Sequence, residues 1–166
     1  MAKSLSKAYR NPSASAPGGL NYAAPDLTRN PPRSPRTRLG GYVHLPRLLD
    51  KARAVAAGKG GDFHYNCPFD QQFFAFTGID HGPFMAKIKK GGSDSEMLAY
   101  VRSKSKRQPF EIAAWSAYME QWTPSQPDKR DFVNEVHKKN APDRDDISTW
   151  FDWLELDDYV TYGGKP

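Results

Sequence analysis

The sequence predicts an all-α protein: a single irregular bundle of about six or seven short helices with an extended N-terminal arm. From about residue 42 onward, apolar side chains recur at helical spacing, and residues typical of helix starts and stops separate the stretches. Convincing β-strand alternation is absent there, and only 158–162 fits a short extended piece. The 166 residues suffice for one domain with an appendage, so we divide the chain into an arm, 1–41, and a helical globular domain, 42–166.

The predicted arm is basic and rich in proline. It holds six of the fourteen prolines of the chain, which lack an N–H and disfavour helix, and its apolar residues follow no period. Seven basic residues against Asp26 alone give the arm a charge of +6, whereas the helical domain carries −1. Such a segment buries too little surface to order itself, so we expect any order in it to come from contact with another chain.

Basic side chains of the arm and of the first helix are the candidate binding residues. They are Arg29, Arg33, Arg36, Arg38, Arg47 and Lys51. Guanidinium groups suit phosphates and acidic protein surfaces, so the arm would contact protein subunits of a larger complex or nucleic acid. Arg47 and Lys51, with His44 in front of them, would form a pocket for a small anion. The simpler alternatives are a solubilising tail and an ordinary solvated helix face.

The first two helices follow from apolar spacing and proline positions. Leucines and alanines three and four residues apart predict a helix over 45–57, with Pro46 in its first turn. A second helix is expected over 68–77, directly after Cys67, with Pro68 at its first position and phenylalanines on one face. A glycine follows each of the two stretches and ends the helix.

Capping residues and prolines mark the next three helices. Asp80 is expected to cap a short helix, and a capping box over 93–96 starts another. The fifth helix begins near Pro109 and carries aromatic residues at helical spacing as far as Trp122.

Two further helices complete the prediction. The proline-containing stretch 123–127 interrupts the chain, and Asp128 opens a helix that ends near residue 140. Apolar residues from Ile147 to Leu154 predict the last helix, and the three aspartates just before it suit its positive N-terminus.

Long strings of the sequence match a known family. They are YVHLPRLLDKAR at 42–53, FHYNCPFDQ at 63–71, TGID at 77–80, EIAAWSAY at 111–118 and WFD at 150–152. These strings resemble family 5069 of the domains of unknown function, a bacterial group, and the similarity covers roughly residues 25–166. The resemblance implies a small helical domain from a bacterial source, and it implies no activity.

The stretch 62–70 gathers the most versatile side chains of the chain, His64, Asn66, Cys67 and Asp70. In one interpretation Cys67, just before a helix N-terminus, is a nucleophile with His64 as its base and Asp70 nearby. We prefer the structural interpretation, in which Cys67 is buried at the helix start. His64 and Asn66 would then use their side chains to satisfy backbone groups of the loop.

Complete catalytic and metal-binding patterns are missing from the sequence. It has no phosphate-binding glycine loop, no G-x-S-x-G elbow and no CxxC pair. His64 and Cys67 supply two metal ligands, with His44 or Asp70 as additions, but no second paired motif completes a set. We therefore predict no cofactor, no metal and no catalytic residue.

The preferred functional hypothesis is a non-enzymatic accessory subunit that docks on a larger assembly through its globule and its basic arm. A single cysteine, no signal peptide and no apolar stretch of membrane-spanning length predict a cytoplasmic protein. The assembly would be a ribonucleoprotein or would lie at the cytoplasmic face of a membrane, where anionic headgroups attract a basic arm. The alternative is a small-molecule-binding protein or enzyme built on His64, Asn66, Cys67 and Asp70.

Overall fold

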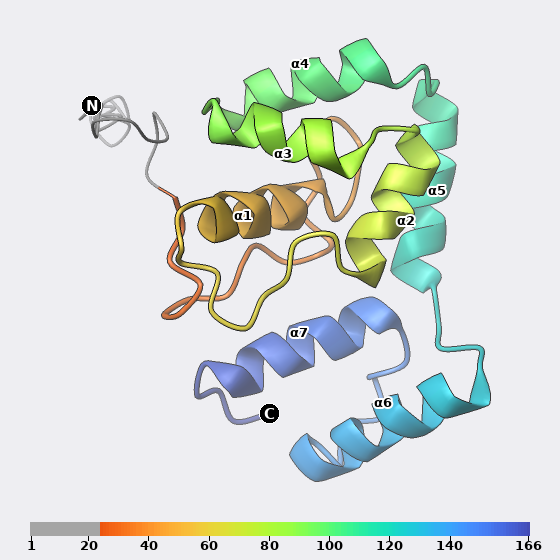
Figure 1. The fold of residues 1–166 in the computed structure, drawn as a ribbon. Coiled ribbons are helices and arrows are strands. Elements are labelled where there is room, and N and C mark those ends of the chain that lie inside the picture. Colours follow the sequence, from red (N-terminus) through yellow and green to blue (C-terminus); the bar gives the residue numbers. More distant parts are fainter. Residues whose placement is uncertain (1–23) are drawn as a thin grey trace, which may run out of the picture.

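The computed structural model describes residues 24–166 and confirms the all-α prediction (Figure 1). These residues form seven α-helices and no strand, and their one isolated β-bridge joins Leu39 to Tyr42. The helices are α1 Leu45–Ala56, α2 Pro68–Thr77, α3 His81–Lys89, α4 Asp94–Lys104, α5 Pro109–Gln121, α6 Pro127–Asn140 and α7 Trp150–Thr161. The predicted capping residues hold the starts of α3 and α4, because Asp80 and Ser93 each accept a backbone N–H of the following turn.

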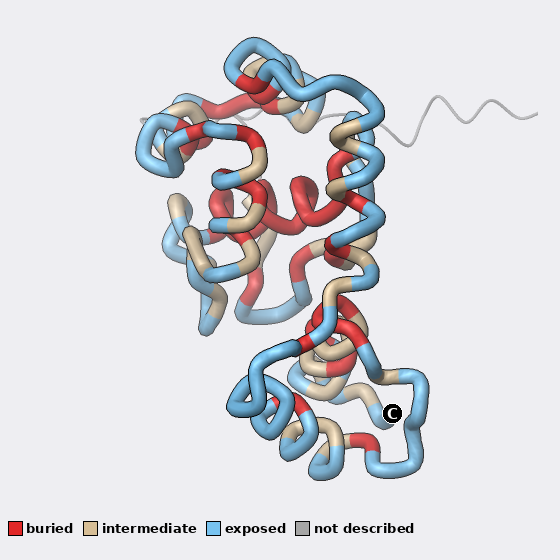
Figure 2. Tube along the Cα trace, turned by 90° about the vertical axis from the view of Figure 1, so that its right-hand side faces the viewer, coloured by how far each residue is buried: buried red, intermediate tan, exposed pale blue. Residues whose placement is uncertain are grey.

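Helix α1 lies in the interior of the fold, and every residue from Leu45 to Ala54 is buried (Figure 2). Its leucines and Ala52 are fully buried in the main core, which α2, α3 and α4 complete with aromatic and aliphatic side chains. Its charged residues are buried as well, each at most 9% exposed: Arg47, Asp50, Lys51 and Arg53. The face of α1 that sequence spacing marks as polar is therefore part of the interior.

Each buried charge on α1 has an opposite charge from another segment. The pairs are Arg47 with Asp158 of α7 at 2.5 Å, Asp50 with Arg33 at 2.7 Å, Lys51 with Asp70 of α2 at 2.8 Å and Arg53 with Asp94 of α4 at 2.6 Å. An unpaired charge in a protein interior costs several kcal/mol. Each pair therefore fixes the segment that supplies the partner against α1.

Residues 24–41 pack on the helical body as irregular turns. Leu27 is 2% exposed, its N–H donates to the carbonyl of Lys59, and its own carbonyl accepts from the Tyr162 hydroxyl. The expectation that order in the arm comes from another chain is wrong for these residues, because their partners belong to the same chain. The remainder of the predicted arm, 1–23, lies outside the described residues.

A second, smaller core joins α5 to α7. It consists of Val43, Met119, Phe151 and Leu154, with partly buried tryptophans packed around them. Helix α6 lies against α7 at the outside of the molecule, and Val133 is its buried residue (Figure 1).

The last helix differs from its prediction at both ends. It begins at Trp150, behind the N-cap Thr149, so Ile147 precedes it. It runs as far as Thr161, so the extended piece predicted over 158–162 is wrong. The longer helix brings the buried Asp158 within reach of Arg47 on α1. Local residue patterns carry no information about this distant partner.

The buried pair of Arg47 and Asp158 gives a test of how α1 is held. Arg47→Met is expected to lower the free energy of unfolding by about 3 kcal/mol, because it leaves the Asp158 carboxylate buried and unpaired. Adding Asp158→Leu should restore most of the loss, since the second change removes the stranded charge. Urea denaturation of the single and double variants measures both values.

Arg144→Met is the matched control, because its pair with Asp146 is exposed and should contribute less than about 1 kcal/mol. An equal loss in the single and the double Arg47 variants would contradict the expectation.

Candidate ligand pocket

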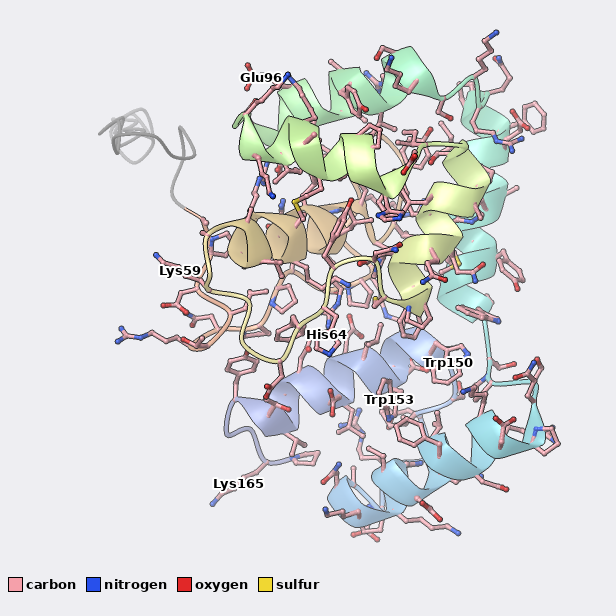
Figure 3. The ribbon with its side chains drawn as sticks, in the orientation of Figure 1. Lys59, His64, Glu96, Trp150, Trp153 and Lys165 are labelled. Carbon is pink, nitrogen blue, oxygen red and sulfur yellow. The ribbon has the colours of Figure 1, made fainter. Side chains whose placement is uncertain are left out.

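A pocket of about 390 Å³ opens between α1, the loop that joins α1 to α2, the start of α2, and α7. We call it the Cys67 pocket. Its wall includes His44, Arg47, Lys51, Asp62, Phe63, His64, Cys67, Phe69, Trp153 and Asp157. Figure 3 marks two of these side chains, His64 on the loop and Trp153 on α7. The pocket thus combines an aromatic wall with a group of polar side chains.

A row of four polar side chains leads from the core to this pocket. His44 Nε2 lies 2.8 Å from Asp70 Oδ1, and Lys51 Nζ lies 2.9 Å from Asp70 Oδ2. The same ammonium donates to Cys67 Sγ at 3.0 Å. His44, Lys51 and Asp70 are buried, whereas Cys67 is partly exposed. The row therefore ends at a sulfur that the pocket can reach.

Local chain geometry puts these four side chains together. Asp70 is the third residue of α2 and accepts the N–H of Cys67 at 3.3 Å, which closes a capping box. His44 and Asn66 take left-handed backbone conformations with φ of 64° and 61°, at the turns that lead into α1 and α2. Lys51 lies seven residues after His44, two helical turns along α1, so both reach the same carboxylate.

Burial affects the pKa values of two members of the row, His44 and Asp70. It lowers the pKa of His44 below the ordinary value, although the hydrogen bond to Asp70 acts in the opposite direction. Burial alone would raise the pKa of Asp70, but the bonds and charges of His44 and Lys51 outweigh it and lower that pKa. Neutral His44 then donates from Nε2, and its Nδ1 is buried without a partner among the described residues.

The opposite wall is supplied by α7 and by Arg47. Arg47 is held by Asp158, and its guanidinium lies 5.6 Å from the centroid of the Phe63 ring. Burial and the neighbouring Asp158 raise the pKa of Asp157, and Arg47 acts in the opposite direction. This side of the pocket is therefore lined by an aromatic ring and a half-buried carboxyl group.

The family assignment agrees with the predicted resemblance. Residues 29–160 match the family model described as Domain of unknown function (DUF5069), which covers well over half of the chain. The chain belongs to the DUF5069 family. Comparison with curated protein sequences gives no significant match. The matched segment contains every residue of the Cys67 row and nearly all of the wall.

In this DUF5069 domain the 62–70 cluster is arranged differently from the prediction. Cys67 is partly exposed beside an ammonium group, so the expectation that it is buried is wrong. The side chain of His64 is exposed, and its ring makes no hydrogen bond within the described residues, to Cys67 or to the backbone. The loop carbonyls of His64 and Asn66 accept instead from Lys51 at 3.3 Å and from Gln71 at 3.0 Å.

The predicted basic binding residues are mostly engaged inside this DUF5069 domain. Arg33 binds Asp50 and Asp94, Arg36 binds Asp152 and Glu155, and Arg38 binds Glu120. Arg47 and Lys51 line the Cys67 pocket but are paired with buried aspartates, and Arg29 is exposed beside Asp26. Sequence reasoning missed the contact between Lys51 and Cys67, because no local pattern links positions sixteen residues apart.

Two further observations concern the part of the chain that the structure describes. No group of three or more histidine, cysteine, aspartate or glutamate side chains in residues 24–166 is arranged to hold a metal ion. No helix in the same range is both long and apolar enough to span a membrane.

The lowered pKa of His44 predicts a loss of stability in mild acid. Unfolded His44 takes up a proton near its ordinary pKa of about 6.5, whereas the buried ring resists it. The unfolded chain then binds more protons, so the free energy of unfolding should fall as the pH drops below about 6.5, by up to about 1.4 kcal/mol per pH unit. Urea denaturation across this range measures the slope.

His44→Gln should remove the slope, because it keeps a donor for Asp70 and deletes the titrating ring. Asp70, with its lowered pKa, contributes stability that is lost only at more acidic pH, so its effect is separate. An unchanged slope in His44→Gln would show that other groups cause the loss.

Proposed function

We propose that this protein binds a small molecule in the Cys67 pocket and that the sulfur of Cys67 contacts the ligand. One observation carries the proposal: the row of His44, Asp70 and Lys51 ends in an ammonium 3.0 Å from a partly exposed sulfur in the pocket wall. Partly exposed cysteines in electropositive surroundings are those that take part in chemistry, whereas structural cysteines are buried and inert.

The row contains more polar groups than the start of α2 needs in order to fold. A carboxylate at Asp70 is enough to close the capping box, and a buried lysine is not part of that motif. Burying Lys51 and Asp70 together carries a desolvation cost, and apolar replacements of buried ion pairs are often equally stable. An ammonium placed between a carboxylate and a sulfur therefore supports a functional role.

The walls indicate the kind of ligand. Phe63, Phe69 and Trp153 supply aromatic side chains to the wall for an apolar body, while Lys51 and Cys67 supply polar groups. Small-molecule sites commonly combine an apolar lining with a few placed polar groups, and their volumes run from about 300 to 1,000 Å³. We infer a ligand with a ring or a short apolar chain and one polar end that faces Cys67.

The hypothesis of an accessory subunit stays a prediction. It depended on arginines of the arm reaching a partner, and Arg33, Arg36 and Arg38 instead bind carboxylates of the same chain. These contacts favour the alternative hypothesis of a small-molecule-binding protein built on the 62–70 cluster. In this proposal Lys51 joins the site through its contact with Cys67, and the exposed His64 lies in the pocket wall.

Reaction with iodoacetamide tests whether the sulfur of Cys67 is accessible and reactive. The folded chain is expected to react at Cys67, its single cysteine, because the sulfur is partly exposed. Lys51→Met should slow the reaction about tenfold, since the reacting thiol anion loses a cation 3.0 Å away. Mass spectrometry of timed samples gives the rates.

Lys89→Met, an exposed change on α3, controls for the loss of one positive charge. The double variant Lys51→Met/Asp70→Asn avoids leaving a buried carboxylate without a cation, and circular dichroism confirms that each variant is folded. A native chain that resists the reagent, or equal rates in Lys51→Met and Lys89→Met, would count against the proposal.

A fragment screen tests ligand binding itself. Small aromatic fragments with one polar group are added to the isotope-labelled full chain, and backbone amide shifts are followed by NMR. We expect shifts at the loop 58–67 and at α7, and their loss after Cys67 is alkylated, because the added group fills the pocket. Shifts that are confined to other surfaces, or that survive alkylation, would refute this placement of the ligand.

A further inference from the structure

Three arginines from three segments line a second pocket, which shares no lining residue with the Cys67 pocket. Arg38 comes from the segment before α1, Arg102 from the last turn of α4, and Arg107 from the link between α4 and α5. The pocket has a volume of about 440 Å³, and we call it the arginine pocket. Guanidinium groups that converge on one pocket are a feature of sites for oxyanions.

Each of these guanidinium groups keeps N–H donors that no acceptor within residues 24–166 uses. Arg38 binds both Glu120 oxygens through Nη2 alone, which leaves Nε and Nη1. Arg107 donates from Nε to the carbonyl of Phe76 and from Nη1 to Glu111, which leaves Nη2. No hydrogen bond or ion pair within residues 24–166 involves the Arg102 guanidinium, which carries five N–H donors.

The local charge favours an anion. The three guanidinium charges are opposed by two carboxylates, Glu111 and Glu120, and neither of these lines the pocket. The segment 102–107 holds four basic residues and no acidic one. Tyr42 is also among the lining residues, and burial raises the pKa of its phenol, which therefore stays neutral and adds no negative charge.

One wall of the arginine pocket is backbone without side chains. Gly40 and Gly41 take positive φ values of 61° and 92°, and a Cβ at Gly40 would overlap the side chain of Leu98. Within the described residues neither glycine N–H donates a hydrogen bond. Two backbone N–H groups without an acceptor in the described residues therefore belong to residues that line the pocket beside the arginines.

We propose that the arginine pocket binds a small molecule that carries a phosphate group. No carboxylate within residues 24–166 pairs with the Arg102 guanidinium, while Glu120 and Glu111 hold Arg38 and Arg107 in position. Planar guanidinium groups match phosphate oxygens in pairs. Because the volume exceeds what one phosphate fills and Ile112 lines one side, the phosphate is expected to carry a second phosphate or an organic body.

Isothermal titration calorimetry of the full chain is the test. Pyrophosphate, inorganic phosphate and adenosine diphosphate are titrated separately at low salt. Pyrophosphate or adenosine diphosphate should bind more tightly than inorganic phosphate, and Arg102→Gln should weaken the tighter ligand about tenfold. Arg102→Gln is expected to leave the fold unchanged, because the Arg102 side chain is exposed and makes no hydrogen bond or ion pair within residues 24–166.

Arg130→Gln on α6 is the matched control, an exposed arginine outside the pocket, and it should leave affinity unchanged. No binding of any of the three anions overturns the proposal, and so does an equal loss of affinity in the Arg102 and Arg130 variants. A fourth titration uses single-stranded RNA. Binding of RNA without binding of pyrophosphate or adenosine diphosphate would replace the proposal with a nucleic-acid surface.

Discussion

The burial of helix α1 from Leu45 to Ala54 is the constraint on which the rest of this structure depends. The helix carries four charged side chains into the interior, and a buried charge is stable only beside an opposite one. The opposite charges come from the segment before α1 and from α2, α4 and α7. One helix thus helps to determine where four other parts of the chain pack, and its pair with Arg33 is one of the contacts that hold residues 24–41 on the body.

The same constraint creates the candidate site. An ammonium group has three donors, and those of Lys51 go to Asp70, to Cys67 and to the carbonyl of His64. One contact belongs to the core, one faces a pocket and one fixes the loop between them. The chemistry of the sulfur is therefore tied to the stability of the core. A bound ligand at Cys67 would act on the packing of α1 and α2 through Lys51.

The two pockets differ in chemistry and are joined by a short piece of chain. Tyr42 lines the arginine pocket, and His44, two residues later, lines the Cys67 pocket. The first offers guanidinium and backbone donors to an anion, and the second offers ring faces and a sulfur to an apolar molecule with one polar end. Val43 between them is fully buried in the second core.

The sequence by itself determined the helices, because caps, prolines and apolar spacing act within one or two turns of the chain. The starts of α1, α2 and α5 could be predicted from Pro46, Pro68 and Pro109. The residue types in 62–70 indicated part of the candidate site. Tertiary structure alone decided the partners of Arg33 and Lys51, the partial exposure of Cys67 and the length of α7. The spacing of residues on α1 predicts a polar face, but it does not tell whether water or another segment covers that face. The reason is that an ion pair between distant residues depends on the path of the whole chain.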